Sequence, residues 1–224
     1  MNKKGWQVPR KRFGQHFLQD ERVISAILQA MHLKREDKVV EIGPGRGALT
    51  WPLLKQLSQL YVIEYDRDIC AVWRQHAIPA LTLIEADALT VDFSAWGAGV
   101  RVVGNLPYNI STAILIHLLD ATQVIQDIHV MLQKEVADRL LAPVGCKAYS
   151  RFSVMMQTYF EGVGLLDVPP EAFNPPPKVW SSVVRLTPKR PVPTVDRVAL
   201  ERLLLAAFSM RRKTLFNNLS GIKK

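Results

Sequence analysis

The chain has 224 residues, of which 48% are hydrophobic, so it can bury one good-sized core but not two large domains. Lysine and arginine number 29 against 20 aspartate and glutamate, which gives a formal net charge of +9. This surplus favours a polyanionic partner, because neutralised phosphates release condensed counterions.

Several kinds of protein are disfavoured by what the sequence lacks. No apolar stretch approaches the roughly 20 residues that cross a bilayer, and the first twenty residues lack the apolar run of a signal peptide. Cys70 and Cys146 stand far apart, and no pair among the five histidines has the spacing of metal ligands. We therefore expect a soluble, cytoplasmic, monomeric protein with no membrane contact, no disulfide framework and no metal.

The first predicted elements alternate between helix and strand. Asp20 is expected to cap a helix whose apolar residues recur at three- and four-residue spacing as far as Met31. A short apolar strand over 38–42 then ends in Gly-Pro-Gly, and a helix over 48–57 follows it. The same alternation predicts strands over 60–63, 81–84, 100–103 and 128–132, with helices over 67–74, 111–119 and around 136–141.

Strands that alternate with helices in this way predict a mostly parallel α/β sheet with helices on both faces. The segments 159–168 and 179–186 are joined by a proline-rich connection, so they are expected to form a hairpin at one edge. A linker over 187–193 precedes two more helical stretches. The predicted organisation is a basic segment over 1–19, a main domain over 20–188, and a linker with a small, apparently incomplete helical domain over 189–224.

The glycine-rich segment after the first main strand predicts a binding site for an adenosine-containing cofactor. Gly43 and Gly45 let a ligand approach the main chain, where a Cβ atom would block it. Glu64 ends the next strand, where a carboxylate can accept both ribose hydroxyls. This pattern also fits a nicotinamide cofactor, and a glycine turn without a ligand remains possible at this point.

A loop after the fourth strand, Asn105-Leu106-Pro107-Tyr108, narrows the chemistry. The amide oxygen of Asn105 and the main-chain oxygen of Leu106 can each accept a hydrogen from an aromatic amine, which turns its lone pair out of the ring plane. Tyr108 offers a face on which an extruded base can stack. Asp87, after the third strand, can accept from an adenine amino group, although a lone aspartate there is more often a turn or helix cap.

With these segments, the chain resembles the ribosomal RNA adenine dimethyltransferases. Three further segments carry the resemblance: Arg12-Phe13-Gly14-Gln15-His16-Phe17-Leu18, Phe-Asn-Pro-Pro-Pro-Lys from residue 173, and Arg-Arg-Lys-Thr from residue 211. The resemblance runs from residue 10 to about 219 and is closest to the bacterial small-subunit type. It implies a Rossmann-like class I methyltransferase sheet of seven strands and a small C-terminal helical domain. It also implies transfer of methyl groups from S-adenosylmethionine to two adjacent adenosines near the 3′ end of 16S ribosomal RNA, in the small (30S) subunit or its precursor.

The expected site residues, taken from the motifs, the charge clusters and the resemblance, fall into three groups. The cofactor is expected at His16, Leu18, Gly43, Gly45, Glu64, Asp87, Ala88 and Asn105. The target base is expected at Asn105, Leu106, Tyr108 and Phe173, with Phe173 facing Tyr108 across the base unless it is a core aromatic. RNA phosphates are expected at Lys11, Arg12, Lys178, Arg211, Arg212 and Lys213. His16 stands where many relatives have asparagine, and the C-terminal helical domain of the family normally runs well past Leu219.

Two other functions fit the sequence less well than methylation of ribosomal RNA. A nicotinamide oxidoreductase would share the glycine turn but has no use for Asn-Leu-Pro-Tyr. DNA adenine methyltransferases usually carry Pro-Pro-Tyr at this position. Two alternatives stay open, a large-subunit ribosomal RNA methyltransferase of the Erm type and a non-catalytic assembly factor.

Overall fold

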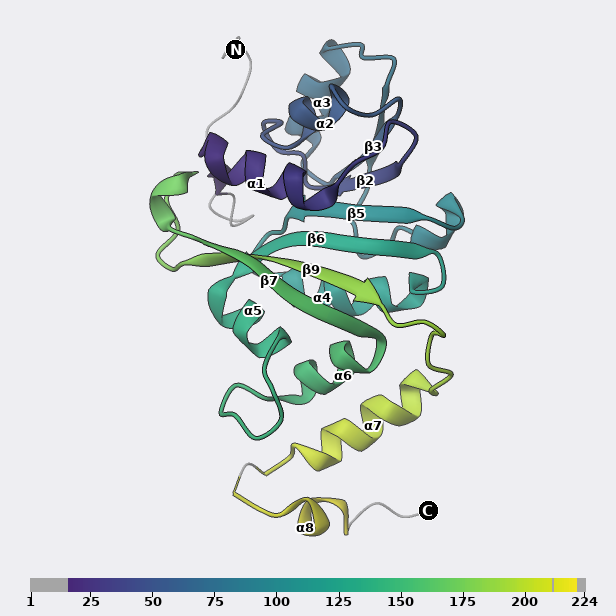
Figure 1. Cartoon of the computed structure of the whole chain (residues 1–224), viewed down its shortest axis with the longest axis vertical. Helices are drawn as coiled ribbons and strands as arrows, with labels where there is room; N and C mark the ends of the chain where they lie inside the picture. Colours follow the sequence, from purple (N-terminus) through teal and green to yellow (C-terminus); the bar gives the residue numbers. More distant parts are fainter. Residues whose placement is uncertain (1–15, 211, 221–224) are drawn as a thin grey trace.

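A seven-stranded sheet forms the centre of the molecule (Figure 1). The computed structural model describes residues 16–210 and 212–220, and the strands lie in the order β4-β3-β2-β5-β6-β9-β7. The first five run parallel, whereas β9 is antiparallel to both of its neighbours. The strand bounds are β2 (Lys38–Ile42), β3 (Leu60–Glu64), β4 (Leu81–Glu85), β5 (Val100–Asn105), β6 (Ile125–Gln133), β7 (Phe160–Val168) and β9 (Ser181–Pro188).

Helices cover both faces of this sheet (Figure 1). One face packs against α4, α5, α6 and α7, and the other packs against α1 and α2. Along β2 the side chains alternate between the two sides, because Val40 and Ile42 join the first core and Val39 joins the second. The helix bounds are α1 (Glu21–Met31), α2 (Thr50–Leu54), α3 (Arg67–Gln75), α4 (Ser111–His117), α5 (Lys134–Leu140), α6 (Arg151–Tyr159), α7 (Arg197–Ala207) and α8 (Leu215–Leu219).

The predicted α/β class, the mostly parallel sheet and the antiparallel hairpin at its edge are confirmed. Asp20 caps α1 as expected, since its Oδ1 atom accepts from the main-chain nitrogen of Arg22 at 2.8 Å. Two predictions were wrong in detail, because the helix expected over 48–57 is confined to α2 and the linker expected from Thr187 begins only after β9 ends at Pro188. The helix α6 was not predicted.

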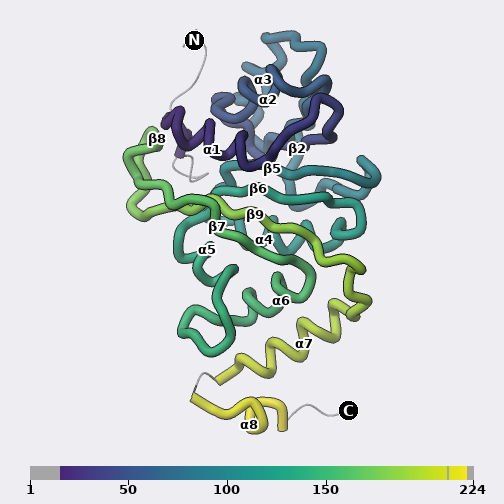
Figure 2. The backbone as a smooth tube through the Cα atoms, in the orientation of Figure 1, coloured from purple at the N-terminus to yellow at the C-terminus, as the bar shows by residue number. Residues whose placement is uncertain are grey.

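A second, two-stranded sheet was also missed. In it β1 (Phe17–Leu18) pairs antiparallel with β8 (Phe173–Asn174), and Leu18 lies opposite Phe173. Figure 2 shows β8 beside the start of α1, although the two segments lie far apart in the sequence. Strands of two residues carry no periodicity, so only their tertiary pairing reveals them. This pairing brings the start of the described chain to the edge of the candidate site.

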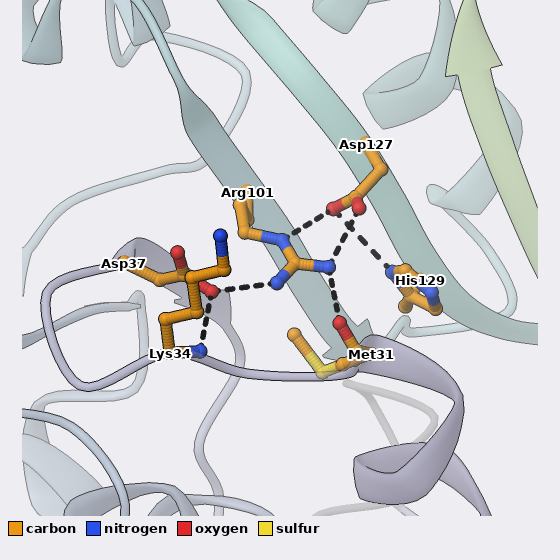
Figure 3. Close-up of polar contacts among 6 residues, drawn as sticks. All are labelled: Met31, Lys34, Asp37, Arg101, Asp127 and His129. Carbon is orange, nitrogen blue, oxygen red and sulfur yellow. Dashed lines mark hydrogen bonds and ion pairs between the residues drawn. The ribbon is translucent and has the colours of Figure 1, made fainter.

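A buried charge cluster ties the end of α1 to the sheet (Figure 3). The guanidinium of Arg101, on β5, donates two hydrogen bonds to Asp127 at 2.9 and 2.7 Å and one to Asp37 at 2.7 Å. Nη2, one of the two nitrogens that bind Asp127, also donates to the main-chain oxygen of Met31 at 2.5 Å. The Arg101 side chain is only 5% exposed, and each of its three guanidinium nitrogens donates to an acceptor inside the protein.

The C-terminal helices extend away from the sheet, and α7 packs against α6 (Figure 1). Leu204 of α7 is buried in the first core, and Arg197 forms an ion pair with Asp120. The turn between α7 and α8 carries Arg212 and lies at the opposite end of the molecule from α2 and α3. Within the described ranges, no helix is long and apolar enough to cross a membrane.

Candidate active site

A cavity of about 1300 Å³ opens at the carboxyl ends of β2, β3, β4 and β5. The strand order reverses between β2 and β5, and ligands of open α/β sheets bind at such a reversal. Every residue predicted to hold the cofactor lines this one cavity, although these residues come from five separate segments of the chain. They are His16, Leu18, Gly43, Gly45, Glu64, Asp87, Ala88 and Asn105.

The floor of the cavity is the glycine turn after β2. Gly43 and Gly45 have φ angles of 70° and 50°, a left-handed region that other residues rarely adopt. The turn is anchored to the neighbouring strand β3, because the nitrogen of Gly43 donates to the main-chain oxygen of Ile63 at 2.9 Å. The indole of Trp73 donates to the main-chain oxygen of Gly45 at 3.0 Å. These bonds hold the turn at the wall of the cavity, which Gly43 and Gly45 both line.

Two carboxylates stand at the ends of the next strands. Glu64 is 8% exposed, and its Oε1 atom accepts from the main-chain nitrogen of Asp66 at 2.9 Å. Burial raises the pKa of Glu64, and main-chain hydrogen bonds, that of Asp66 foremost, oppose the rise. Asp87 accepts from the main-chain nitrogen of Leu89 at 2.9 Å, so it stabilises its own turn while it also lines the cavity.

The loop after β5 brings an amide and a phenol to the same cavity. The side-chain nitrogen of Asn105 donates to the main-chain oxygen of His16 at 2.9 Å. The Tyr108 hydroxyl is 2.6 Å from the Ser181 hydroxyl on β9. Burial raises the pKa of Tyr108, an effect that the bond to Ser181 partly offsets, so the phenol stays protonated at neutral pH. Leu106 also lines the cavity, although it is only 1% exposed.

Phe173 does not join this group. Its pairing with Leu18 places it in the second core, where it is 4% exposed, and its neighbour Asn174 lines the cavity instead. Phe173 therefore lies in the core and does not line the cavity, and its place across the base from Tyr108 stays a prediction. The ring that the structure does place against Tyr108 is His16, with centroids 5.4 Å apart and planes inclined by 27°.

The predicted phosphate contacts are spread along the chain. Lys178, Arg212 and Lys213 are exposed. Lys178 follows the β8 segment near the cavity, whereas Arg212 and Lys213 lie in the distant turn between α7 and α8. Lys11, Arg12 and Arg211 fall outside the described residues.

Sequence reasoning assigned no role to two residues that line the cavity, Glu41 and Tyr65. Glu41 is 1% exposed, lines the cavity, and has a pKa that burial raises to about 8. Tyr65 follows Glu64, lines the cavity and is 62% exposed. The sequence offered two signals for these residues. Glu41 is a carboxylate within the otherwise apolar strand 38–42, and Tyr65 is an aromatic residue directly after a strand.

Comparison with known proteins identifies the family. A family model described as ribosomal RNA adenine dimethylase matches residues 7–223. A ribosomal RNA small subunit methyltransferase A from Legionella pneumophila is 56% identical over 220 residues, which cover 96% of this chain and 85% of the relative. A counterpart from Thiobacillus denitrificans is 52% identical over 219 residues, covering 96% and 86%.

A solved structure points the same way. The crystal structure of a dimethyladenosine transferase from Plasmodium falciparum aligns with a TM-score of 0.80 at 30% identity, over 91% of this chain and 74% of the other. Sequence and fold thus relate the chain to the same family, and the cavity contains the glycine turn and the loop after β5. The chain belongs to the ribosomal RNA adenine dimethylase family.

Proposed function

We propose that this enzyme dimethylates the N6 amines of two adjacent adenosines in a 3′-terminal hairpin of 16S ribosomal RNA, using S-adenosylmethionine, during small-subunit biogenesis. The observation that carries the proposal is the identity of 56% to a relative named for the small subunit, over nearly the whole chain. The crystal structure of a 23S rRNA methyltransferase, ErmE, is 29% identical and has a TM-score of 0.74 over 91% of this chain and 83% of the other. The large-subunit alternative is therefore the weaker one.

The residues of the cavity fit S-adenosylmethionine. Gly43 presents an open main chain, since the nearest atom to a Cβ added there is the main-chain oxygen of Asn105 at 4.0 Å. The buried Glu64 carboxylate stands one strand away, where it would also accept from ribose hydroxyls. When bound, this cofactor supplies an electrophilic methyl group on its sulfonium. Gly43 and Gly45 would lie beneath its methionine part, Glu64 would accept from the ribose and Asp87 from the adenine amine.

The loop after β5 supplies what the target amine needs. Asn105 donates through its nitrogen to His16, so the planar amide has its oxygen on the other side, available to accept one amine hydrogen. The main-chain oxygen of Leu106 accepts the other, and together they turn the nitrogen lone pair out of the adenine ring. Tyr108 acts as a stacking surface and not as a base, because its raised pKa keeps the phenol protonated.

Electrostatic attraction to RNA comes from the exposed basic residues. Lys178 would hold the RNA beside the cavity, and Arg212 and Lys213 would contact it further away. We assign residues 189–224 to the linker and a helical RNA-binding region, which follow the main domain over 20–188. A monomer acting on the small subunit or its precursor in the cytoplasm is consistent with this division of labour.

Deletion of the gene tests the proposal in cells. Mass spectrometry of nuclease-digested 16S ribosomal RNA should show N6,N6-dimethyladenosine in the parent strain and unmodified adenosine in the deletion strain. Restoration by the intact chain, but not by the Asn105→Ala variant, separates catalysis from a non-catalytic assembly role. Loss of methylation from 23S ribosomal RNA instead would favour the Erm-type alternative.

A further inference from the structure

We propose that the imidazole of His16 holds the place of the target base against Tyr108 and moves aside when the base enters. The inference rests on the proposed function, in which the target adenine stacks on Tyr108. It gives His16 a specific role in base entry, beyond its expected position along the cofactor. His16 would be a positioning residue that the base displaces.

The two rings leave no room for a base between them. Their centroids are 5.4 Å apart and their planes are inclined by only 27°. A third ring inserted between two others needs a separation of roughly 7 Å, twice the contact distance of carbon atoms. Both residues line the cavity, so the face of Tyr108 that His16 covers belongs to the candidate site. A base can reach this face only if the imidazole leaves it.

The main chain of His16 is anchored independently of its ring. Its carbonyl oxygen accepts the Asn105 amide at 2.9 Å, and the next residue, Phe17, pairs with Asn174 across the small sheet. The ring can therefore rotate about its side-chain bonds without releasing the Asn105 amide. Movement of the ring and orientation of the catalytic amide are thus separable.

Among the residues that the structure describes, two interactions hold the ring. Nδ1 donates to the main-chain oxygen of Pro175 at 2.8 Å, at an exposed position, and the ring stacks on Tyr108. An exposed hydrogen bond exchanges readily with water. An adenine has a larger aromatic face than an imidazole, so it can replace the lost stacking. Until the base enters, the imidazole would exclude water from the face of the Tyr108 ring.

The alternative is that the His16 ring is a fixed part of the cavity wall, and it predicts the opposite change in base binding. If the imidazole were a permanent lining that the base contacts, removing the ring would weaken base binding. If it holds the place of the base, removing the ring abolishes a competitor and strengthens binding. The sign of one change in affinity separates the two.

The test measures RNA binding without cofactor, because His16 is also expected beside the cofactor. A hairpin RNA with the 16S sequence carries 2-aminopurine at one target position, and its fluorescence is quenched when the base stacks. His16→Asn removes the ring and keeps a polar side chain. We expect this variant to bind the hairpin about three to ten times more tightly than wild type, the range for losing one competing contact.

Two controls make the result specific. His32→Asn changes an exposed histidine at the C-terminal cap of α1, where the φ angle of 47° suits asparagine, and should leave binding unchanged. In a Tyr108→Leu background, His16→Asn should have no effect, because the covered ring is gone. Unchanged or weaker binding by His16→Asn, with quenching that still depends on Tyr108, would overturn the inference and leave the proposed function standing.

Nuclear magnetic resonance gives a second readout on the wild-type chain. The His16 Hε1 proton should be shifted by the Tyr108 ring current and should move towards its random-coil position when the hairpin is added. If the resonance stays in place at saturating RNA, the imidazole has not moved and the inference is wrong. If the 16S hairpin shows no quenching that depends on Tyr108 in any variant, this inference fails, while the proposed function is tested separately on small subunits.

Discussion

The side-chain nitrogen of Asn105 donates to the main-chain oxygen of His16 at 2.9 Å, a bond between residues 89 positions apart in the chain. The bond fixes which side of the planar amide faces the candidate substrate. It also couples the loop after β5 to the small sheet, which begins at Phe17. The amide orientation thus depends on a contact that local sequence does not reveal.

Asn105 and Tyr108 should fail in different ways when substituted. Asn105→Ala removes an acceptor that is needed as the amine rehybridises, so we expect kcat to fall about 100-fold with little change in RNA affinity. Tyr108→Phe keeps the stacking ring and should stay active, whereas Tyr108→Ala should lose much of the rate. Single-turnover assays that resolve mono- from dimethylated adenosine measure these effects. Wild-type rates for Asn105→Ala with no activity for Tyr108→Phe would instead require a role for the phenol hydroxyl.

Glu64 should contribute to cofactor affinity through its carboxylate. Glu64→Ala should weaken S-adenosylmethionine binding by roughly 1.5–3 kcal/mol, the range for losing charged hydrogen bonds. Glu85→Ala is the matched control, because Glu85 ends the neighbouring strand β4 but pairs with Arg74 outside the cavity. Titration calorimetry measures both variants. Equal affinities for wild type and Glu64→Ala would remove Glu64 from the cofactor site.

The strands and the glycine turn were predictable because their signals are local. The run 38–42 is apolar and ends in glycine, and the observed strand has the same bounds. Glu64 and Asp87 follow strands in sequence, so a parallel sheet brings them to one edge. His16 and Phe173 had no such signal, since their positions depend on the two-residue strands β1 and β8. A motif predicts residue types near a site, but only tertiary pairing decides which ring faces Tyr108.

Glu41 should make the stability of the cofactor-free protein depend on pH. Burial raises the pKa of Glu41 to about 8, so the folded state keeps a proton that the unfolded chain releases above about pH 4.5. This contribution to stability is present at low pH and is lost as pH rises from about 4.5 to 8, by up to about 1.4 kcal/mol per pH unit. Urea unfolding of Glu41→Gln should show a shallower decline over this range. The exposed Glu36→Gln change is the control, and a decline identical to wild type in Glu41→Gln would show that the carboxyl ionises normally.

Arg101 should be far more important for stability than an exposed arginine. Arg101→Met leaves Asp127 and Asp37 without their cation, which should cost roughly 3–5 kcal/mol in the free energy of unfolding. Arg67→Met, which breaks an exposed pair with Glu85, should cost about 0–1 kcal/mol. Denaturant unfolding compares the two. A loss below about 1 kcal/mol for Arg101→Met would mean that the cluster in Figure 3 is dispensable.

The same cluster should also be sensitive to acid. Burial alone would raise the pKa of Asp127, but the contacts with His129 and Arg101 outweigh burial and lower it. The contribution of Asp127 is therefore present above about pH 4 and is lost as pH falls through its lowered folded-state pKa. Acid unfolding followed by circular dichroism should begin at a higher pH in Asp127→Asn than in wild type. An unchanged acid midpoint would exclude this carboxylate as a source of stability.

Methylation of the proposed substrate by the purified chain tests the proposed function most directly. Small subunits from a strain lacking the modification are incubated with the protein and S-adenosylmethionine, and the digested 16S hairpin is analysed by mass spectrometry. The expected result is N6,N6-dimethyladenosine at both adjacent positions, with strongly reduced yield from Asn105→Ala. No methylation of these adenosines by a chain that binds S-adenosylmethionine, or methylation of 23S ribosomal RNA in their place, would contradict it.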